Sequence, residues 1–199
     1  AIWCAKSSSV QTTPACSIPK KRRTKSFGNF RRISGRFSQF STYDFEGNFN
    51  RIQYEINGNL RFLNNWWIDF GAAHKPRIFI NTFLRGGPRW RYSQENFGYA
   101  FFGTDERKKL RTSWGMVYSK AKQDNFTFIE VSGDVTYQPT DAMRISISPQ
   151  YNYNPNKTQY VTQADNNGTT RYILGDIDNQ TLSASIRFNY TINPNLSIQ

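Results

Sequence analysis

The chain has 199 residues and a net charge of +12, and 37% of its residues are hydrophobic while 16% are aromatic. No run of roughly 18 apolar residues occurs, so the sequence predicts no transmembrane helix; a barrel strand is still allowed, because it needs only ~9–11 residues with every second one apolar. Residues 1–40 hold nine basic and no acidic residues, whereas residues 41–199 hold 17 basic and 14 acidic ones, which confines any polyanion-binding function to the N-terminal segment.

Residues 1–26 are rich in Ser, Thr, Pro and Lys and have neither a strand period nor a helix period. We therefore expect a separate basic tail here and a β-barrel segment over residues 27–199. The run Lys20-Lys21-Arg22-Arg23 has no accompanying aromatic platform, so we expect a solvated tail and no nucleic-acid partner. Cys4 and Cys16 are the two cysteines, and their disulfide state stays open.

Strict alternation of apolar and polar residues begins near residue 50. In residues 51–62 the even positions are Ile, Tyr, Ile, Gly, Leu and Phe, and the odd positions are all polar or charged. Only a strand can use this pattern, because a helix would wind the apolar residues around its whole surface. The recurring pattern predicts about eight strands, at 50–62, 66–73, 89–103, 108–119, 126–137, 142–153, 171–192 and from 196.

The predicted connections alternate in length. Short turns fall at 63–65, 104–107, 138–141 and 193–195, and longer polar segments lie near 74–96, 120–125 and 154–170. This order is typical of an antiparallel up-and-down transmembrane β-barrel with tight turns at one rim and loops at the other. The predicted eighth strand begins at residue 196 and has only four residues by Gln199. A closed barrel leaves no unpaired edge, so we expect this chain to be part of a larger barrel.

A soluble β-sandwich also alternates, but its strands average ~5–6 residues, whereas these runs reach ten to twelve. Aromatic residues near the strand ends would form interfacial girdles. The alternation predicts a lumen-facing set and a lipid-facing set. The lumen-facing set is Arg51, Glu55, Arg61, Arg111, Asp134, Arg144, Gln150 and Arg187. The lipid-facing set is Ile52, Tyr54, Ile56, Leu60, Trp66, Ile145, Ile147, Tyr151, Ile186, Phe188 and Tyr190.

Several short motifs occur in a fixed order along the chain: Asn57-Gly58-Asn59, Leu63-Asn64-Asn65-Trp66, Leu84-Arg85-Gly86-Gly87-Pro88, Thr104-Asp105-Glu106-Arg107-Lys108-Lys109-Leu110 and Asn193-Pro194-Asn195-Leu196. Over roughly residues 38–199 they resemble the C-terminal barrel of large Bacteroidetes outer-membrane proteins. The N-terminal half of those proteins is similar to carbohydrate-binding module family 9, and their barrel half is a domain of unknown function. The resemblance implies an outer-membrane barrel, but it assigns a glycan-binding role to no residue of this chain.

The segment Arg85, Gly86, Gly87 and Pro88 is the most distinctive loop motif. Its glycines would allow a ligand to approach the backbone, but we favour a tight turn in a loop folded at the barrel mouth or into the lumen. It lacks the Gly-Lys-Ser/Thr ending of a phosphate-binding loop. His74 is the only histidine, and no nucleophile, paired carboxylates or metal-ligand spacing accompanies it, so we expect no catalytic residue, no cofactor and no metal.

The expected function is a non-enzymatic channel, transporter or assembly component of the bacterial outer membrane, with a polar lumen. Its partners would be outer-membrane lipid, other outer-membrane or periplasmic proteins, and glycans. The alternative is a soluble β-sheet carbohydrate-binding domain, in which Trp90, Tyr92, Phe97 and Tyr99 would be the stacking platforms.

Overall fold

The computed structural model describes residues 29–92, 94–122, 126–193 and 196–198, and its regular elements are all strands. The strands are β1 (Phe30–Tyr43), β2 (Phe49–Phe62), β3 (Trp67–Ile80), β4 (Trp90–Tyr92), β5 (Glu95–Gly103), β6 (Leu110–Ala121), β7 (Thr127–Thr140), β8 (Met143–Tyr153), β9 (Asn156–Asn166), β10 (Thr169–Ile177), β11 (Gln180–Asn193) and β12 (Leu196–Ile198). No helix within these described ranges is long and apolar enough to cross a membrane.

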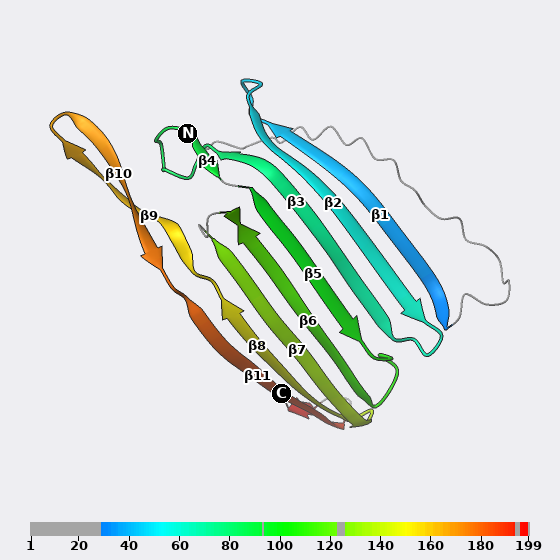
Figure 1. The fold of residues 1–199 in the computed structure, drawn as a ribbon. Coiled ribbons are helices and arrows are strands. Elements are labelled where there is room, and N and C mark those ends of the chain that lie inside the picture. The colour runs from blue at the N-terminus through cyan, green and yellow to red at the C-terminus, as the bar shows by residue number, and fades with distance from the viewer. Residues whose placement is uncertain (1–28, 93, 123–125, 194–195, 199) are drawn as a thin grey trace.

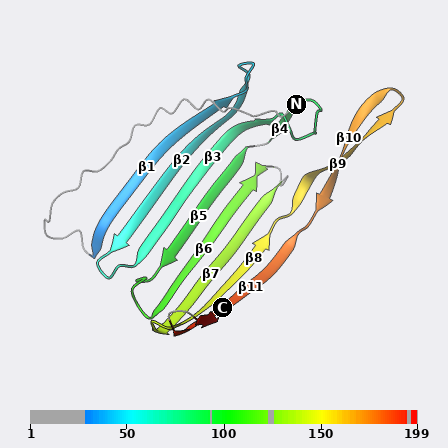
Figure 2. The same ribbon diagram turned by 180° about the vertical axis from the view of Figure 1, so that it is seen from behind.

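The large sheet is antiparallel and has the order β1-β2-β3-β5-β6-β7-β8-β11-β12, with β4 paired to β3. It forms a single layer with β1 and β11 at opposite sides, and the separate β9–β10 hairpin projects from one end (Figures 1 and 2). The sheet is open over the described residues, since β1 pairs with β2 only and β11 pairs on its second side with the short β12 alone.

Successive connections lie at alternate ends of the sheet, but the predicted alternation in length holds only in part, because the turn predicted at 104–107 runs over 104–109 and has six residues, whereas the predicted long connection between β6 and β7 has five. Turns 63–66, 104–109 and 141–142 lie at one end of the sheet, which we call the short-turn rim. Segments 44–48, 81–89 and 154–179, together with Lys122 and Phe126, lie at the other end, the loop rim. The all-β antiparallel class and the up-and-down order of neighbouring strands are therefore confirmed, while closure into a barrel stays a proposal.

The structure differs from the predicted strands in several places, among them 89–103, which contains the two strands β4 and β5. Strand β1 was not predicted, although Phe30–Tyr43 pairs along β2 over most of its length. Strand β3 runs seven residues beyond the predicted end at 73, to Ile80. The predicted loop 154–170 contains β9 and the start of β10, because Asn167 (φ 54°) and Gly168 (φ 76°) adopt the two positive φ values of a tight hairpin turn. The predicted strand 171–192 is in fact the rest of β10 followed by β11.

The sheet has almost no apolar core. Among the described residues the buried apolar ones are Ala73, Ile78, Leu84 and Ala121, and no large side chain is fully buried. The sheet is therefore held mainly by its ladders of backbone hydrogen bonds and by cross-strand side-chain pairs.

The short-turn rim contains one compact ion pair. The Asp105 carboxylate accepts hydrogen bonds from Nε and Nη2 of Arg107, at 3.0 and 2.9 Å, and from the Arg107 backbone N–H at 3.0 Å. It also accepts a 3.2 Å hydrogen bond from Asn65 of the preceding short turn, so Asp105 joins two turns. These interactions with Arg107, more than any other cause, hold the pKa of the Asp105 carboxyl well below its usual range.

We predict that Asp105→Asn lowers the free energy of unfolding at neutral pH. A carboxyl whose pKa is depressed in the folded state stabilises the fold above its unfolded pKa of about 3.9, and this contribution is lost as the pH falls through the lower folded value. The difference between wild type and variant should therefore be full above about pH 4 and shrink below it. Denaturant titrations of the folded protein from pH 7 to pH 3 measure this, with Asp141→Asn, at an exposed aspartate in the β7–β8 turn, as the control.

Candidate functional site: the polar face and its loop-rim pocket

Strand pairing divides the large sheet into two faces, because residues that pair across antiparallel strands point to the same side. One face, called the apolar face, carries these residues: Ile33, Phe37, Tyr54, Ile56, Leu60, Ile68, Phe70, Phe102, Trp114, Met116, Tyr118, Val131, Tyr137, Ile145, Ile147, Tyr151, Leu182, Ile186, Phe188 and Tyr190. The opposite side is called the polar face. It carries nearly all the paired Asp, Glu, Lys and Arg residues of the sheet, and the exceptions Arg77, Arg91 and Lys120 lie at the loop rim.

The apolar face is more exposed than the polar face, whereas a soluble protein buries its apolar side chains and exposes its polar ones. Apolar-face side chains remain exposed, with Ile56 at 54%, Met116 at 46% and Ile186 at 73% of their full exposure. Every buried residue in the described strands of the large sheet lies on the polar face, including Ser38, Ser119 and Thr136. The side chains on the polar face are thus packed against one another, and the large side chains on the apolar face are exposed.

Several hydrogen-bonded clusters organise the polar face, one of which joins Asn59 and Arg61 to Asp69. Tyr99 on β5 donates a 2.9 Å hydrogen bond to Oδ1 of Asn57 on β2, and the Asn57 amide in turn donates to Glu55. The Asp134 carboxylate on β7 accepts from the hydroxyls of Thr136 at 2.9 Å and of Ser148 on β8 at 2.8 Å. These contacts satisfy carboxylates that would otherwise be costly in a partly dehydrated setting.

A further cluster lies near the loop rim. Lys75 on β3 forms a 2.8 Å ion pair with Glu95 on β5, and Ser119 on β6 donates a 2.9 Å hydrogen bond to the same carboxylate oxygen. The side chains of Lys75 and Glu95 are only 17% and 15% exposed. Three neighbouring strands are therefore linked across the polar face at this level.

Aromatic rings on the polar face cover glycines of the neighbouring strand. The ring of Tyr99 lies over Gly71, that of Trp67 over Gly103 and that of Phe101 over Gly115, each at its paired position, so a Cβ atom on any of these glycines would collide with the ring. The sequence analysis did not place Trp67 and Phe101 on this face. The signal that identifies them is the pairing of an aromatic residue with a glycine across two strands.

The predicted site residues fall into their two sets without mixing. Arg51, Glu55, Arg61, Arg111, Asp134, Arg144, Gln150 and Arg187 share the polar face. Ile52, Tyr54, Ile56, Leu60, Ile145, Ile147, Tyr151, Ile186, Phe188 and Tyr190 share the apolar face. Trp66 lies in the short turn before β3 and is exposed. That these faces meet a lumen and lipid stays a prediction.

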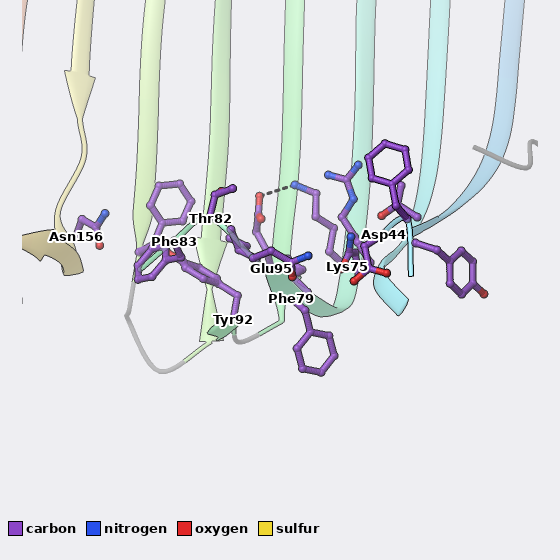
Figure 3. A pocket seen from close by; sticks show the side chains of 17 residues that line it. Asp44, Lys75, Phe79, Thr82, Phe83, Tyr92, Glu95 and Asn156 are labelled. Atoms are coloured by element: carbon purple, nitrogen blue, oxygen red, sulfur yellow. Dashed lines mark hydrogen bonds and ion pairs between the residues drawn. The ribbon is translucent and has the colours of Figure 1, made fainter. Parts of the chain in front are cut away.

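A pocket of about 720 Å³ opens at the loop rim of the polar face. Its wall on the sheet includes Arg51, Lys75, Ile78 and Glu95, and segment 81–83 together with Tyr92 covers it from the loop side (Figure 3). Phe83 stacks on Trp90 with ring centroids 5.2 Å apart and an interplanar angle of 19°. The ring of Tyr92 meets Phe83 edge-on at 6.0 Å.

The loop motif of Arg85, Gly86, Gly87 and Pro88 follows the segment 81–83 that lines the pocket. Arg85 (φ 49°) and Gly86 (φ 104°) both have positive φ, and the Gly87 N–H donates a 3.2 Å hydrogen bond to the Leu84 carbonyl. This geometry is a tight turn of the type that tolerates left-handed residues at both central positions. The tight turn expected from the sequence is therefore present.

The described residues bring no three His, Cys, Asp or Glu side chains together as a metal ion would need. His74 contacts the Asn96 amide oxygen at 2.7 Å through Nδ1, near the loop rim. The expectation of no enzyme, no cofactor and no metal stays an expectation. The pocket combines charged side chains with aromatic rings, an arrangement that suits the binding of a polar molecule.

A model of a domain of unknown function, DUF5916, matches residues 16–199. The chain belongs to the DUF5916 family. No curated protein and no solved structure matches it. The family has no known function, so the function of this chain must be inferred from its two faces and its pocket. The predicted domain boundary at residue 26 stays a prediction.

We predict that Gly115→Ala destabilises the protein by about 1–3 kcal/mol, because the added Cβ overlaps the Phe101 ring and displaces it from β6. Gly98→Ala is the matched control, since the Cβ at Gly98 would meet only the Gly71 carbonyl oxygen at 3.7 Å. Denaturant titration of both variants measures the difference. Equal stability of the two would contradict the packing of the ring on the glycine.

Proposed function

We propose that this chain forms strands of a bacterial outer-membrane β-barrel that acts as a non-enzymatic channel, transporter or assembly component with a polar lumen. The observation that carries the proposal is the exposure of the apolar face combined with the burial of residues on the polar face. Lipid would cover the apolar side chains, and water would solvate the charged ones.

The length of the strands supports this proposal. Strands β1, β2, β3, β7 and β11 each have 14 residues, which exceeds the ~9–11 residues that a tilted strand needs to cross the hydrocarbon core. Charged residues on the apolar face are confined to the loop rim, where Arg77, Arg91 and Lys120 would reach the lipid headgroups. A band of apolar surface without charge would thus span the membrane interior.

Closure of the sheet is the remaining step of the proposal. A sheet edge exposed to lipid leaves backbone N–H and C=O groups unpaired, and each such group costs several kcal/mol. The outer side of β1 and most of the outer side of β11 would therefore pair with further strands in the complete barrel. The resemblance to the C-terminal barrel of large Bacteroidetes outer-membrane proteins supports the same assignment and the outer-membrane location.

The rival is a soluble β-sheet carbohydrate-binding domain. The stacked rings of Phe83 and Trp90 beside Tyr92 favour it, because aromatic platforms are suited to sugar rings. It requires another protein surface to cover the apolar face. Extraction decides between the two: membranes washed with alkaline carbonate should retain an integral barrel, whereas release without detergent would rule the barrel out.

We predict that an arginine is tolerated on one face of β6 and not on the other. Met116 lies on the apolar face and its neighbour Val117 lies on the polar face opposite Glu130. Met116→Arg should destabilise the membrane-inserted protein by about 2–4 kcal/mol, the cost of an arginine at the bilayer midplane. Val117→Arg gains a carboxylate partner and should leave insertion close to wild type.

Folding into liposomes, followed by denaturant titration, measures both variants. A larger loss for Val117→Arg than for Met116→Arg would reverse the assignment of the two faces. In a soluble sheet, an isolated domain whose apolar face is not covered by a partner would place both arginines in water, and the two variants would then have similar stability.

A further inference from the structure

The loop 81–89 reaches across the polar face. It leaves β3, yet its tip contacts the β9–β10 hairpin, which follows β8. Three strands, β5, β6 and β7, separate β3 from β8, a width of roughly 19 Å at a strand spacing of ~4.8 Å. The loop returns to β4, whose Trp90 pairs with Ile80, so its tip reaches no more than roughly 17 Å from β3, and the projecting β9–β10 hairpin covers the rest of the distance. In Figure 3, Phe83 accordingly lies towards Asn156 and away from Lys75.

The tip of the loop docks on two tyrosines of the hairpin. The Arg85 guanidinium carbon lies 5.5 Å from the ring centre of Tyr160 on β9. Gly87 packs so closely on the ring of Tyr172 on β10 that a Cβ atom there would come within 2.6 Å of two ring carbons. Leu84, at the start of the turn, is only 3% exposed. Cation–π attraction and close packing therefore hold the tip.

The returning end of the loop is fixed to the strands below it. Nη2 of Arg89 donates hydrogen bonds to the carbonyl oxygen of Phe49, at 2.6 Å, and to Oδ1 of Asn50, at 2.8 Å. Nε of Arg89 donates a 3.0 Å hydrogen bond to Oδ1 of Asn81 at the other end of the loop. The loop is thus held at its base by Arg89 and at its tip by the hairpin.

The pocket beneath the loop has balanced charge. Four charged residues line the pocket there, two of each sign: Asp44, Arg51, Lys75 and Glu95. Lys75 and Glu95 neutralise each other directly. The remaining wall is rich in aromatic and aliphatic side chains, among them Phe83 and Tyr92. Such a lining gives little attraction to an ion of either sign and presents flat apolar surfaces to a neutral solute.

We propose that loop 81–89 is a fixed constriction over the polar face, that its docking on Tyr160 and Tyr172 sets the size limit for passage, and that the solutes admitted are uncharged and polar. The proposal rests on the proposed barrel function for the passage, while the docking itself does not depend on it. Arg85 and Gly87 act as positioning residues, since they hold the loop in place.

Passage is tested in liposomes that contain the folded protein, by the rate of swelling in neutral saccharides of increasing size. The double variant Tyr160→Ala, Tyr172→Ala should raise the largest saccharide that enters. The matched control is Val161→Ala, Ile173→Ala, which changes exposed residues on the same two strands and should leave the limit unchanged. An unchanged limit in the tyrosine variant, or equal effects of both variants, would overturn the proposal. Faster entry of a small anion or cation than of a neutral solute of equal size would overturn the solute class.

Docking is tested separately by cross-linking. The variant Gly87→Cys, Tyr172→Cys, with Cys4 and Cys16 changed to serine and with Arg85 and Tyr160 kept to hold the tip, should react with a short bifunctional thiol reagent. The pair Asp141→Cys, Tyr172→Cys, in which Asp141 lies at the short-turn rim, should not react. Absence of the first cross-link would overturn the constriction whatever the protein transports. A cross-link together with no entry of solute through any variant would confirm the docking contact. The same result would overturn the channel function and, with it, the role of the loop as a constriction.

Discussion

Pairing of every strand with its neighbours is the constraint on which the rest of this structure depends. With Ala73, Ile78, Leu84 and Ala121 as the buried apolar residues of the described chain, burial of side chains contributes little to holding the sheet. Continuous backbone ladders take that role, as between β6 and β7, where Leu110 to Lys120 pair without a shift. Where water is excluded, each backbone hydrogen bond of the ladder contributes more to stability, because an unpaired N–H or C=O has no water molecule to bind instead.

The ladders also fix which side chain meets which environment. A slip of one residue in any pair would exchange the two faces and bring residues such as Asp134 and Glu130 among the exposed apolar side chains. The rings over Gly71, Gly103 and Gly115 resist that slip, since each ring fits only opposite a residue without a side chain. Hydrogen bonds such as Tyr99 to Asn57 and Ser148 to Asp134 join neighbouring strands in the same register.

The degree to which the sequence predicts this fold depends on how strictly each strand alternates. The strand predicted at 142–153 is observed as Met143–Tyr153, because apolar and polar residues alternate there without interruption. In β1 the alternation is broken by Gly35, Gln39 and Ser41 on the apolar face, so that strand was not predicted. The β9–β10 hairpin carries a clear Asn167-Gly168 turn signal, which the surrounding polar residues obscured.

The candidate site is predictable only in part, for a related reason. The division of residues between the two faces follows from period 2 alone, and the structure groups all the strand residues of both predicted sets accordingly. The pocket does not follow from it, because β3 has a register shift between its pairs with Ile52 and Tyr54, which places both Lys75 and Ile78 on the polar face although they are three residues apart. Local pattern cannot reveal such a bulge.

The long connections carry the features that alternation leaves undetermined. A strand that crosses lipid must alternate in polarity, whereas a loop at the rim is free to use positive φ, as Arg85 and Gly86 do, and to place aromatic residues next to charges. The distant contacts of loop 81–89 with Tyr160 and Tyr172 are therefore invisible in the periodicity of the chain. They arise because the strand order brings the end of β3 and the hairpin after β8 to the same rim. Under the proposed function, the strands would form the wall of the barrel and the loops at the rim would determine which solute is selected.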